Sequence, residues 1–130
     1  MTSERGSAAL LLLAVAGLIL VLTIGVADIG IALRARLQAA AAADAAALAA
    51  APVTFRPFGA DGSPASEADR LAAANDVVLV TCRCPIDRSW HSRVVEVAVE
   101  RRVALLGLGS ITVGATSRAE FDPARLLADP

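Results

Sequence analysis

The feature that most constrains this chain is an uncharged run of 20 residues near its start, AALLLLAVAGLILVLTIGVA, from Ala8 to Ala27. As an α-helix rising about 1.5 Å per residue, the run spans about 30 Å, the thickness of the hydrocarbon core of a bilayer. A soluble protein of 130 residues has too little remaining chain to enclose so apolar a helix. The run therefore predicts one membrane-spanning helix, residues 8–27.

The residues that flank this run bear on the topology, and they point in two directions. Arg34 and Arg36 follow the run, whereas Glu4 and Arg5 precede it, so a count of basic residues favours a cytoplasmic C-terminal side. The N-terminal flank is very short, however, and the larger C-terminal part has the character of a translocated domain. We expect a single-pass protein of the cell membrane with a cytoplasmic N-terminus and an extracytoplasmic C-terminal domain.

A cleaved secretory signal is the alternative interpretation of the same run. Gly25, Val26 and Ala27 place small residues where a signal peptidase requires them. The run is longer than the apolar core of a typical signal, about 7–15 residues, and helical character continues past Ala27 without a break. We therefore prefer an uncleaved anchor, and a secreted protein cleaved near Ala27 remains the alternative.

The helix is expected to continue beyond the membrane. Residues 28–51 contain strong helix formers, and the first proline of the chain is Pro52. We therefore expect one helix over residues 8–51, in which residues 28–51 project from the bilayer.

A narrow stripe on this projecting half predicts a docking face. Leu37, Asp44 and Leu48 fall, with Leu33, within about 60° of one another on a helical projection. We expect the rest of the chain to pack on this stripe and to supply an arginine or a backbone N–H to Asp44. The alternative is that Asp44 is simply solvated on an alanine-rich helix.

The remainder of the chain predicts a small α+β domain over residues 66–121. After a loop at 52–65, a short helix is expected to start at Ser66 and to end near Asn75. Residues 93–100 alternate between valines on one face and glutamates on the other, as in a half-buried antiparallel strand. The β-branched VVLVTC segment and the alternating residues 111–121 are expected to form two more strands, before a flexible tail at 122–130. The projecting helix would cover the apolar face of this sheet.

The charges and motifs of the chain favour no catalytic or nucleic-acid function. Twelve basic residues, all arginine, balance 13 acidic ones to a net charge of −1, with the two signs interspersed, so no footprint for a nucleic acid is present. The sequence has one histidine and contains no nucleophile elbow, P-loop or dinucleotide-binding glycine pattern. We expect no enzyme, no cofactor and no small-molecule substrate.

The two cysteines, Cys82 and Cys84, flank a single residue at the end of an expected strand. Residues two apart on a strand face the same side, but their Cα atoms lie near the upper limit for a disulfide unless a turn at Pro85 brings them closer. Two states stay open, a disulfide and free or intermolecular thiols. With His91 the cysteines would offer three metal ligands within one loop, which is weak evidence, and we expect no metal.

The predicted order of a long helix, a short helix and a small antiparallel sheet resembles the type IV pilins and pseudopilins. Four stretches make the chain more narrowly similar to the TadE-like proteins of tight-adherence pilus and secretion loci. They are RGSA at 5–8, ARLQAAAAADAAALAAA at 35–51, ADRLAAAN to VTC at 68–82, and VVEVAVE at 94–100 followed by a terminal alternating strand. The alanine-rich piece alone is of low complexity, so the ordered combination carries the likeness.

This resemblance implies that a prepilin-type peptidase recognises Gly6 and cleaves between Gly6 and Ser7, so that residues 1–7 hold a leader and its cleavage site. It also implies that the membrane helix packs laterally with other pilin-like or Tad-type subunits, in a filament at the cell surface or in a tip complex. Related proteins often have Glu at the fifth mature position, which here is Leu11. The departure favours a minor pilin or an assembly accessory over a major polymerising pilin. A signal-anchored cell-surface binding module remains the alternative.

Overall fold

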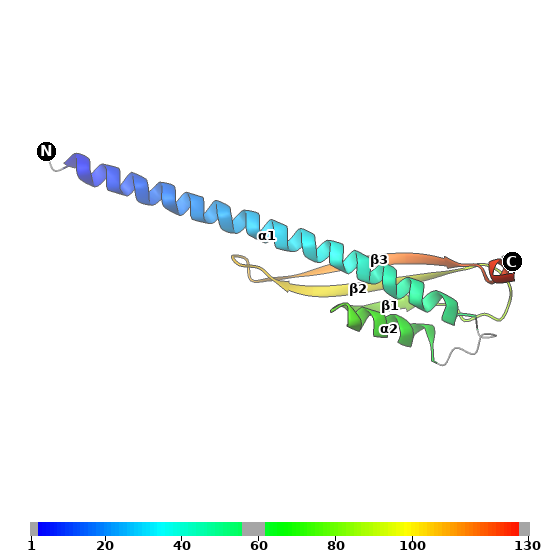
Figure 1. Cartoon of the computed structure of the whole chain (residues 1–130). Coiled ribbons are helices and arrows are strands. Elements are labelled where there is room, and N and C mark those ends of the chain that lie inside the picture. The colour runs from blue at the N-terminus through cyan, green and yellow to red at the C-terminus, as the bar shows by residue number, and fades with distance from the viewer. Residues whose placement is uncertain (1–2, 56–61, 128–130) are drawn as a thin grey trace.

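The computed structural model describes residues 3–55 and 62–127 (Figure 1). The expected leader, loop and tail fall partly on residues 1–2, 56–61 and 128–130, which lie outside the described residues. The order of elements is a long helix, a short helix, three strands and a terminal 3-10 helix. The predicted α+β class, with one long N-terminal helix on a small antiparallel sheet, is confirmed.

The long helix α1 runs from Ser3 to Val53, 51 residues, and so exceeds the predicted 8–51 at both ends. Pro52 lies in its last turn. Just beyond, the backbone N–H and the hydroxyl of Thr54 both donate to the carbonyl of Ala51, at 3.2 and 2.6 Å. These two bonds satisfy a carbonyl that the end of the helix would otherwise leave without a partner.

The short helix α2, Pro64–Ala74, starts two residues earlier than predicted. Its N-cap is Ser63, and Ser66 is the third helical residue of a capping box in which each serine side chain accepts from the backbone N–H of the other. Pro64 follows the cap because its fixed φ suits the first turn. The predicted C-terminal cap, Asn75, is confirmed: its N–H donates to the carbonyl of Ala72 at 3.0 Å, and the next N–H, of Asp76, donates to the carbonyl of Ala73 at 3.1 Å.

The sheet consists of β1 (Val78–Arg83), β2 (Arg93–Ala104) and β3 (Ser110–Phe121), all antiparallel, in the order β1-β2-β3. Val97 of β2 pairs with Cys82 on one side and with Ser117 on the other. The predicted alternation of β2 is confirmed, because Val95, Val97 and Val99 are buried against the helices.

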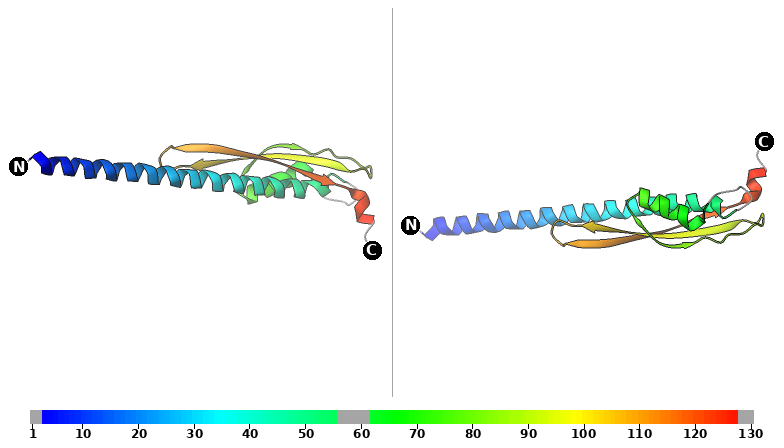
Figure 2. Two further views of the ribbon diagram at one scale, coloured as in Figure 1. Left: turned by 90° about the horizontal axis from the view of Figure 1, so that it is seen from above. Right: turned by 90° about the horizontal axis from the view of Figure 1, so that it is seen from below.

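The two helices form one layer and the sheet forms the other, alongside the C-terminal half of α1 (Figure 2). α1 packs on β2 and β3, and α2 packs on β1 and on α1. The helical side of this interface is almost entirely alanine, and such small side chains let α1 lie close to the sheet. The buried alanines of α1 are Ala35, Ala39, Ala42, Ala43, Ala46, Ala47, Ala50 and Ala51.

The segment expected to be a flexible tail begins with structure. Residues Pro123–Leu127 form the 3-10 helix η2, and Pro123 is buried. This helix lies at the end of the domain farthest from the N-terminus of α1 (Figure 1).

Candidate functional site

The N-terminal half of α1 extends away from the domain (Figure 1), and its apolar side chains are exposed. The helix is long and apolar enough to cross a membrane, and its most apolar window is 0% buried. Leu10, Leu13 and Val26, for example, are each 70% exposed. Because each such side chain is less stable in water than in an apolar medium by about 1.5–3 kcal/mol, this half of the helix requires lipid or neighbouring helices around it.

At the end of this apolar half, the carboxylate of Asp28 binds the turn between β2 and β3. The side chain is only 4% exposed, and its two oxygens accept the backbone N–H groups of Leu106 at 2.6 Å and Gly107 at 3.0 Å. A buried carboxylate is stable only when its oxygens have such donors. Asp28 therefore fixes the hairpin tip to the helix at the boundary between the apolar half and the domain.

The backbone of the β2–β3 turn comes so close to α1 beside Asp28 that position 107 requires a glycine. A Cβ added to Gly107 would lie 2.8 Å from Cγ2 of Ile24 and 3.3 Å from Oδ2 of Asp28. The turn is closed by a hydrogen bond from the N–H of Leu105 to the carbonyl of Gly109, whose φ of +79° also suits glycine. A groove between helix and turn is lined mostly by apolar side chains, including Val21, Ile29 and Leu108.

The predicted docking stripe on α1 is not the surface that packs on the domain. Leu37 and Leu48 are 65% and 67% exposed, whereas Ala46 is fully buried. Nine residues separate Leu37 from Ala46, which places them about half a turn apart on the helix. Alanine forms the packed face because the closely spaced sheet leaves no room for leucine there.

Asp44, the acidic member of the stripe, lies at the edge of the packed face. It accepts a hydrogen bond from the hydroxyl of Ser117 on β3, not from the expected arginine or backbone N–H. One further polar contact joins α1 to the sheet nearer the membrane half, where Arg101 Nη1 donates to Gln38 Oε1 at 2.9 Å. The outward-facing leucines stay mostly exposed.

The residues of the expected cleavage site lie near the start of α1. Gly6 and Ser7 are both helical and exposed, and a Cβ added to Gly6 would meet no atom within 4 Å. The local packing of this chain therefore imposes no need for glycine at position 6.

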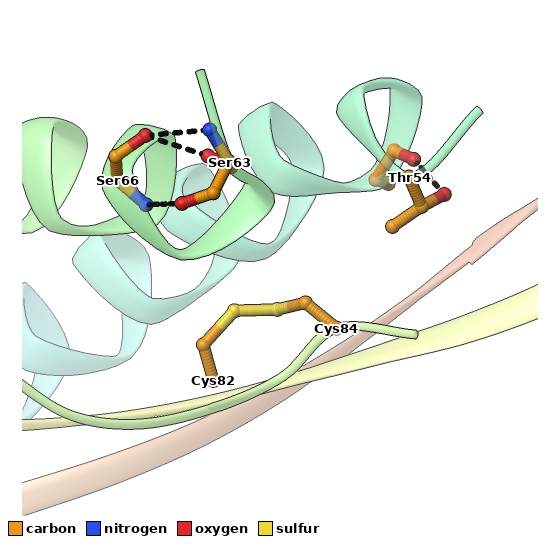
Figure 3. Close-up of a disulfide and its surroundings, with 6 residues drawn as sticks. Thr54, Ser63, Ser66, Cys82 and Cys84 are labelled. Carbon is orange, nitrogen blue, oxygen red and sulfur yellow. Dashed lines mark hydrogen bonds between the residues drawn. A yellow bond between two sulfur atoms is a disulfide. The ribbon is translucent and has the colours of Figure 1, made fainter. Parts of the chain in front are cut away.

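Cys82 and Cys84 are joined in a disulfide with their Cα atoms 5.4 Å apart (Figure 3). β1 ends at Arg83 and Pro85 follows, so the chain leaves the extended geometry where the bridge forms. The sulfur atoms lie on the helical side of the strand, and both cysteines pack against the core. Within the described residues, no group of three His, Cys, Asp or Glu side chains is placed to hold a metal ion.

At the far end of the domain, Arg93 ties three segments together. The residue is 7% exposed, and its guanidinium donates to the carbonyls of Thr54, Asp87, Ser89 and His91. It also lies over the ring of Phe55, 5.5 Å from the centroid, and that ring makes an edge contact with Trp90. Arg93 therefore fastens the end of α1 to the loop between β1 and β2.

The same loop holds one carboxylate with a shifted pKa. The hydroxyl and the N–H of Ser89 donate to Asp87 at 2.6 and 2.9 Å, and these bonds hold the pKa of the Asp87 carboxyl below its usual value. The side chain is fully exposed, so the effect concerns the loop and not the core.

Neither Asp28 nor Arg93 is distinguished by the sequence patterns used to predict sites. The available signal for Asp28 was a single acidic residue directly after an apolar run. The signal for Arg93 was a charged residue on the valine face of an alternating strand, where burial obliges it to find partners.

Comparison with known protein families gives a match to the helix. A family model described as "Putative Flp pilus-assembly TadE/G-like" matches residues 6–53. The matched range covers nearly all of α1 and none of the sheet. No curated protein and no solved structure matches the chain.

Proposed function

We propose, from the TadE/G-like character of residues 6–53, that this membrane-anchored Flp pilus-assembly protein acts as a minor pilin or pseudopilin of a tight-adherence pilus or secretion apparatus. The observation that carries the proposal is the coincidence of the family match with one continuous helix, half uncovered and half packed on a domain. The first half of the helix can hold such a subunit in a membrane, and the second half carries the domain outside the bilayer.

Its partners would be other pilin-like or Tad-type subunits, held by side-by-side packing of helices. The exposed leucines of α1 support this assignment, because Leu33, Leu37 and Leu48 continue the apolar surface beyond the membrane half and are 59%, 65% and 67% exposed. A neighbouring helix would remove these side chains from water. The role is one of assembly, without nucleic acid, cofactor or small-molecule substrate.

A prepilin-type peptidase would process the chain between Gly6 and Ser7. The family match begins at residue 6, and both residues are exposed on the helix. The fifth position after that cut is Leu11, so the mature chain would lack a carboxylate there to neutralise the amino terminus of a neighbour. This difference supports a minor or accessory role over that of the major filament subunit.

In the orientation we propose, the N-terminus is cytoplasmic and the domain is extracytoplasmic. The Cys82–Cys84 disulfide supports this side for the domain, because disulfides persist in oxidising compartments. A tag at either end of the chain, tested for protease access in intact cells, measures the orientation directly.

The test of the function is the N-terminal sequence of the mature protein, obtained by mass spectrometry from the membrane fraction of its native host. A start at Ser7 is the expected result. A start at Met1 or Thr2 would mean a plain signal anchor, and would favour a tethered binding module. A start at Asp28 would mean a secreted protein, and would overturn the assembly role.

A further inference from the structure

The tip of the β2–β3 hairpin is apolar and uncovered. Its sequence from residue 105 is LLGLG, and Leu106 and Leu108 are 70% and 78% exposed, more than most leucines of the bare helix. A turn that ends in water is usually built from polar residues. Two exposed leucines at a hairpin tip therefore need an apolar environment outside the domain.

This tip lies against the apolar half of α1, not against the rest of the domain. Figure 1 shows the hairpin running back along the helix toward its N-terminus, past the reach of α2 and β1. The groove between tip and helix is lined by Val21, Ile24 and Ile29 together with Leu105 and Leu108. The exposed leucines of the tip are thus continuous with the apolar surface that needs a bilayer.

Arginines flank the tip on the side of the domain. Arg101 lines a common depression with Arg34 of α1, and Arg102 donates from Nε and Nη2 to Ser110 Oγ at 3.1 and 3.0 Å. Arg102 is four residues before Leu106, so it stands about 13 Å from the tip along the strand. At a membrane surface, the lipid phosphates lie just outside the acyl chains. The apolar tip and the arginines behind it follow the same order.

We propose that the β2–β3 hairpin tip inserts into the lipid–water interface as a second membrane contact, so that the domain rests on the bilayer instead of standing free at the end of α1. Leu106 and Leu108 enter the boundary of the acyl chains, and the arginines lie level with the lipid phosphates. Asp28 and Gly107 hold the tip at the depth where α1 emerges. The proposal rests on the membrane-anchored part of the proposed function, and not on peptidase processing or filament assembly.

Lipid is the occupant that fits this surface. The tip offers two leucine side chains, whereas a stable protein interface buries about 1,200–2,000 Å² in total. The bilayer that surrounds residues 8–27 also reaches the tip without any further partner, because Asp28 hydrogen-bonds the tip directly after that run. A protein that covered the tip would have to lie within the same membrane.

Depth-dependent quenching of tryptophan fluorescence tests the proposal on the full chain. Trp90→Phe gives a background without tryptophan, because Trp90 is the only one in the chain and phenylalanine retains a ring beside Phe55. In this background Leu108→Trp and, separately, Leu106→Trp report on the tip. Leu18→Trp, in the middle of the apolar run, and Leu127→Trp, on η2 at the opposite end of the domain, are the matched controls. Each protein is placed in vesicles of phosphatidylcholine and phosphatidylglycerol, with and without bromine on the acyl chains.

We expect both tip reporters to lose most of their emission to brominated lipid and to emit at shorter wavelength, as Leu18→Trp does, while Leu127→Trp is unaffected. Loss at Leu18→Trp alone would mean that the chain is anchored but the tip stands off the membrane, which overturns the inference and leaves the proposed function intact. A shift to shorter wavelength at the tip without quenching would mean that protein, such as a second copy, covers it. Absence of quenching at Leu18→Trp as well would overturn the anchoring itself.

Discussion

Asp28 and Gly107 are 79 positions apart in the sequence, yet the Asp28 carboxylate accepts the N–H of Gly107 at 3.0 Å while Ile24, one helical turn away, leaves no room for a side chain there. The contact joins the point where the apolar helix ends to the tip of the longest hairpin. It therefore determines how far along α1 the sheet lies, which the alanine face alone would leave loosely specified.

Loss of the Asp28 carboxylate should destabilise the domain. Asp28→Leu removes both acceptors and leaves the N–H groups of Leu106 and Gly107 without partners in a partly buried turn, so we expect a loss of about 2–4 kcal/mol of unfolding free energy. Thermal unfolding in detergent micelles, followed by circular dichroism, measures the change. Asp44→Leu is the matched control, because its carboxylate is exposed and binds one hydroxyl, and equal effects of the two variants would contradict this account.

A side chain at position 107 should also be costly. Gly107→Ala places a Cβ within 2.8 Å of Ile24, and overpacking of this kind costs about 1–3 kcal/mol. Ile24→Ala should restore most of the loss when combined with it. The control is Gly114→Ala on β3, where the added Cβ has only ordinary contacts, at 3.6 Å or more. If the two losses simply added in the double variant, the proposed clash would not be their cause.

The elements of this fold could be predicted because each has a local signal. A pattern within a few residues predicts each element. Examples are the apolar run, the alternation of Val95, Val97 and Val99, and the helix C-terminal cap at Asn75. The structure begins α2 before the predicted Ser66, because Ser63 is an equally good cap and Pro64 directly after it suits the first turn.

The face of α1 that packs on the domain could not be predicted in the same way. Leucine is the more hydrophobic residue, and a rule based on hydrophobicity selects Leu37 and Leu48 for burial. The packed face is instead decided by how closely the sheet approaches, and that distance depends on residues far away in the sequence, such as Ser117 and Ala119 of β3. The role of Asp28 is non-local for the same reason.

Arg93 should not tolerate replacement by lysine. Its Nη1 donates to the carbonyls of Thr54 and Asp87, and its Nη2 donates to two further carbonyls of the same loop. A single ammonium group cannot satisfy all four carbonyls together. We expect Arg93→Lys to lower the unfolding free energy by about 2–4 kcal/mol, measured by thermal unfolding in micelles. Arg118→Lys is the control, because Arg118 makes a surface ion pair with Glu96 and is 72% exposed, which predicts a change below about 1 kcal/mol.

Opening the disulfide should lower the unfolding free energy less than Asp28→Leu or Arg93→Lys does. The Cys82–Cys84 bridge closes a loop of three residues, so it restricts the unfolded chain little, and its loss in Cys82→Ala/Cys84→Ala should cost about 1–2 kcal/mol. Hydrogen exchange should then rise near the end of β1 and stay unchanged at the β2–β3 tip. A rise at the tip would show that the bridge stabilises the whole sheet and not only its edge strand.

Replacement of Gly6 by a bulky residue should block maturation without affecting the fold. A Cβ at position 6 meets nothing within 4 Å, so Gly6→Leu is expected to leave the unfolding temperature unchanged, and any defect must come from recognition by a peptidase. We expect this variant to accumulate in the membrane of the native host as a precursor that retains residues 1–6, detected by mass spectrometry. Leu11→Ala is the matched control, and it should be processed normally because position 11 lies beyond the proposed cut and is also exposed. Normal processing of Gly6→Leu would refute the role assigned to Gly6, since the structure itself places no demand on that residue.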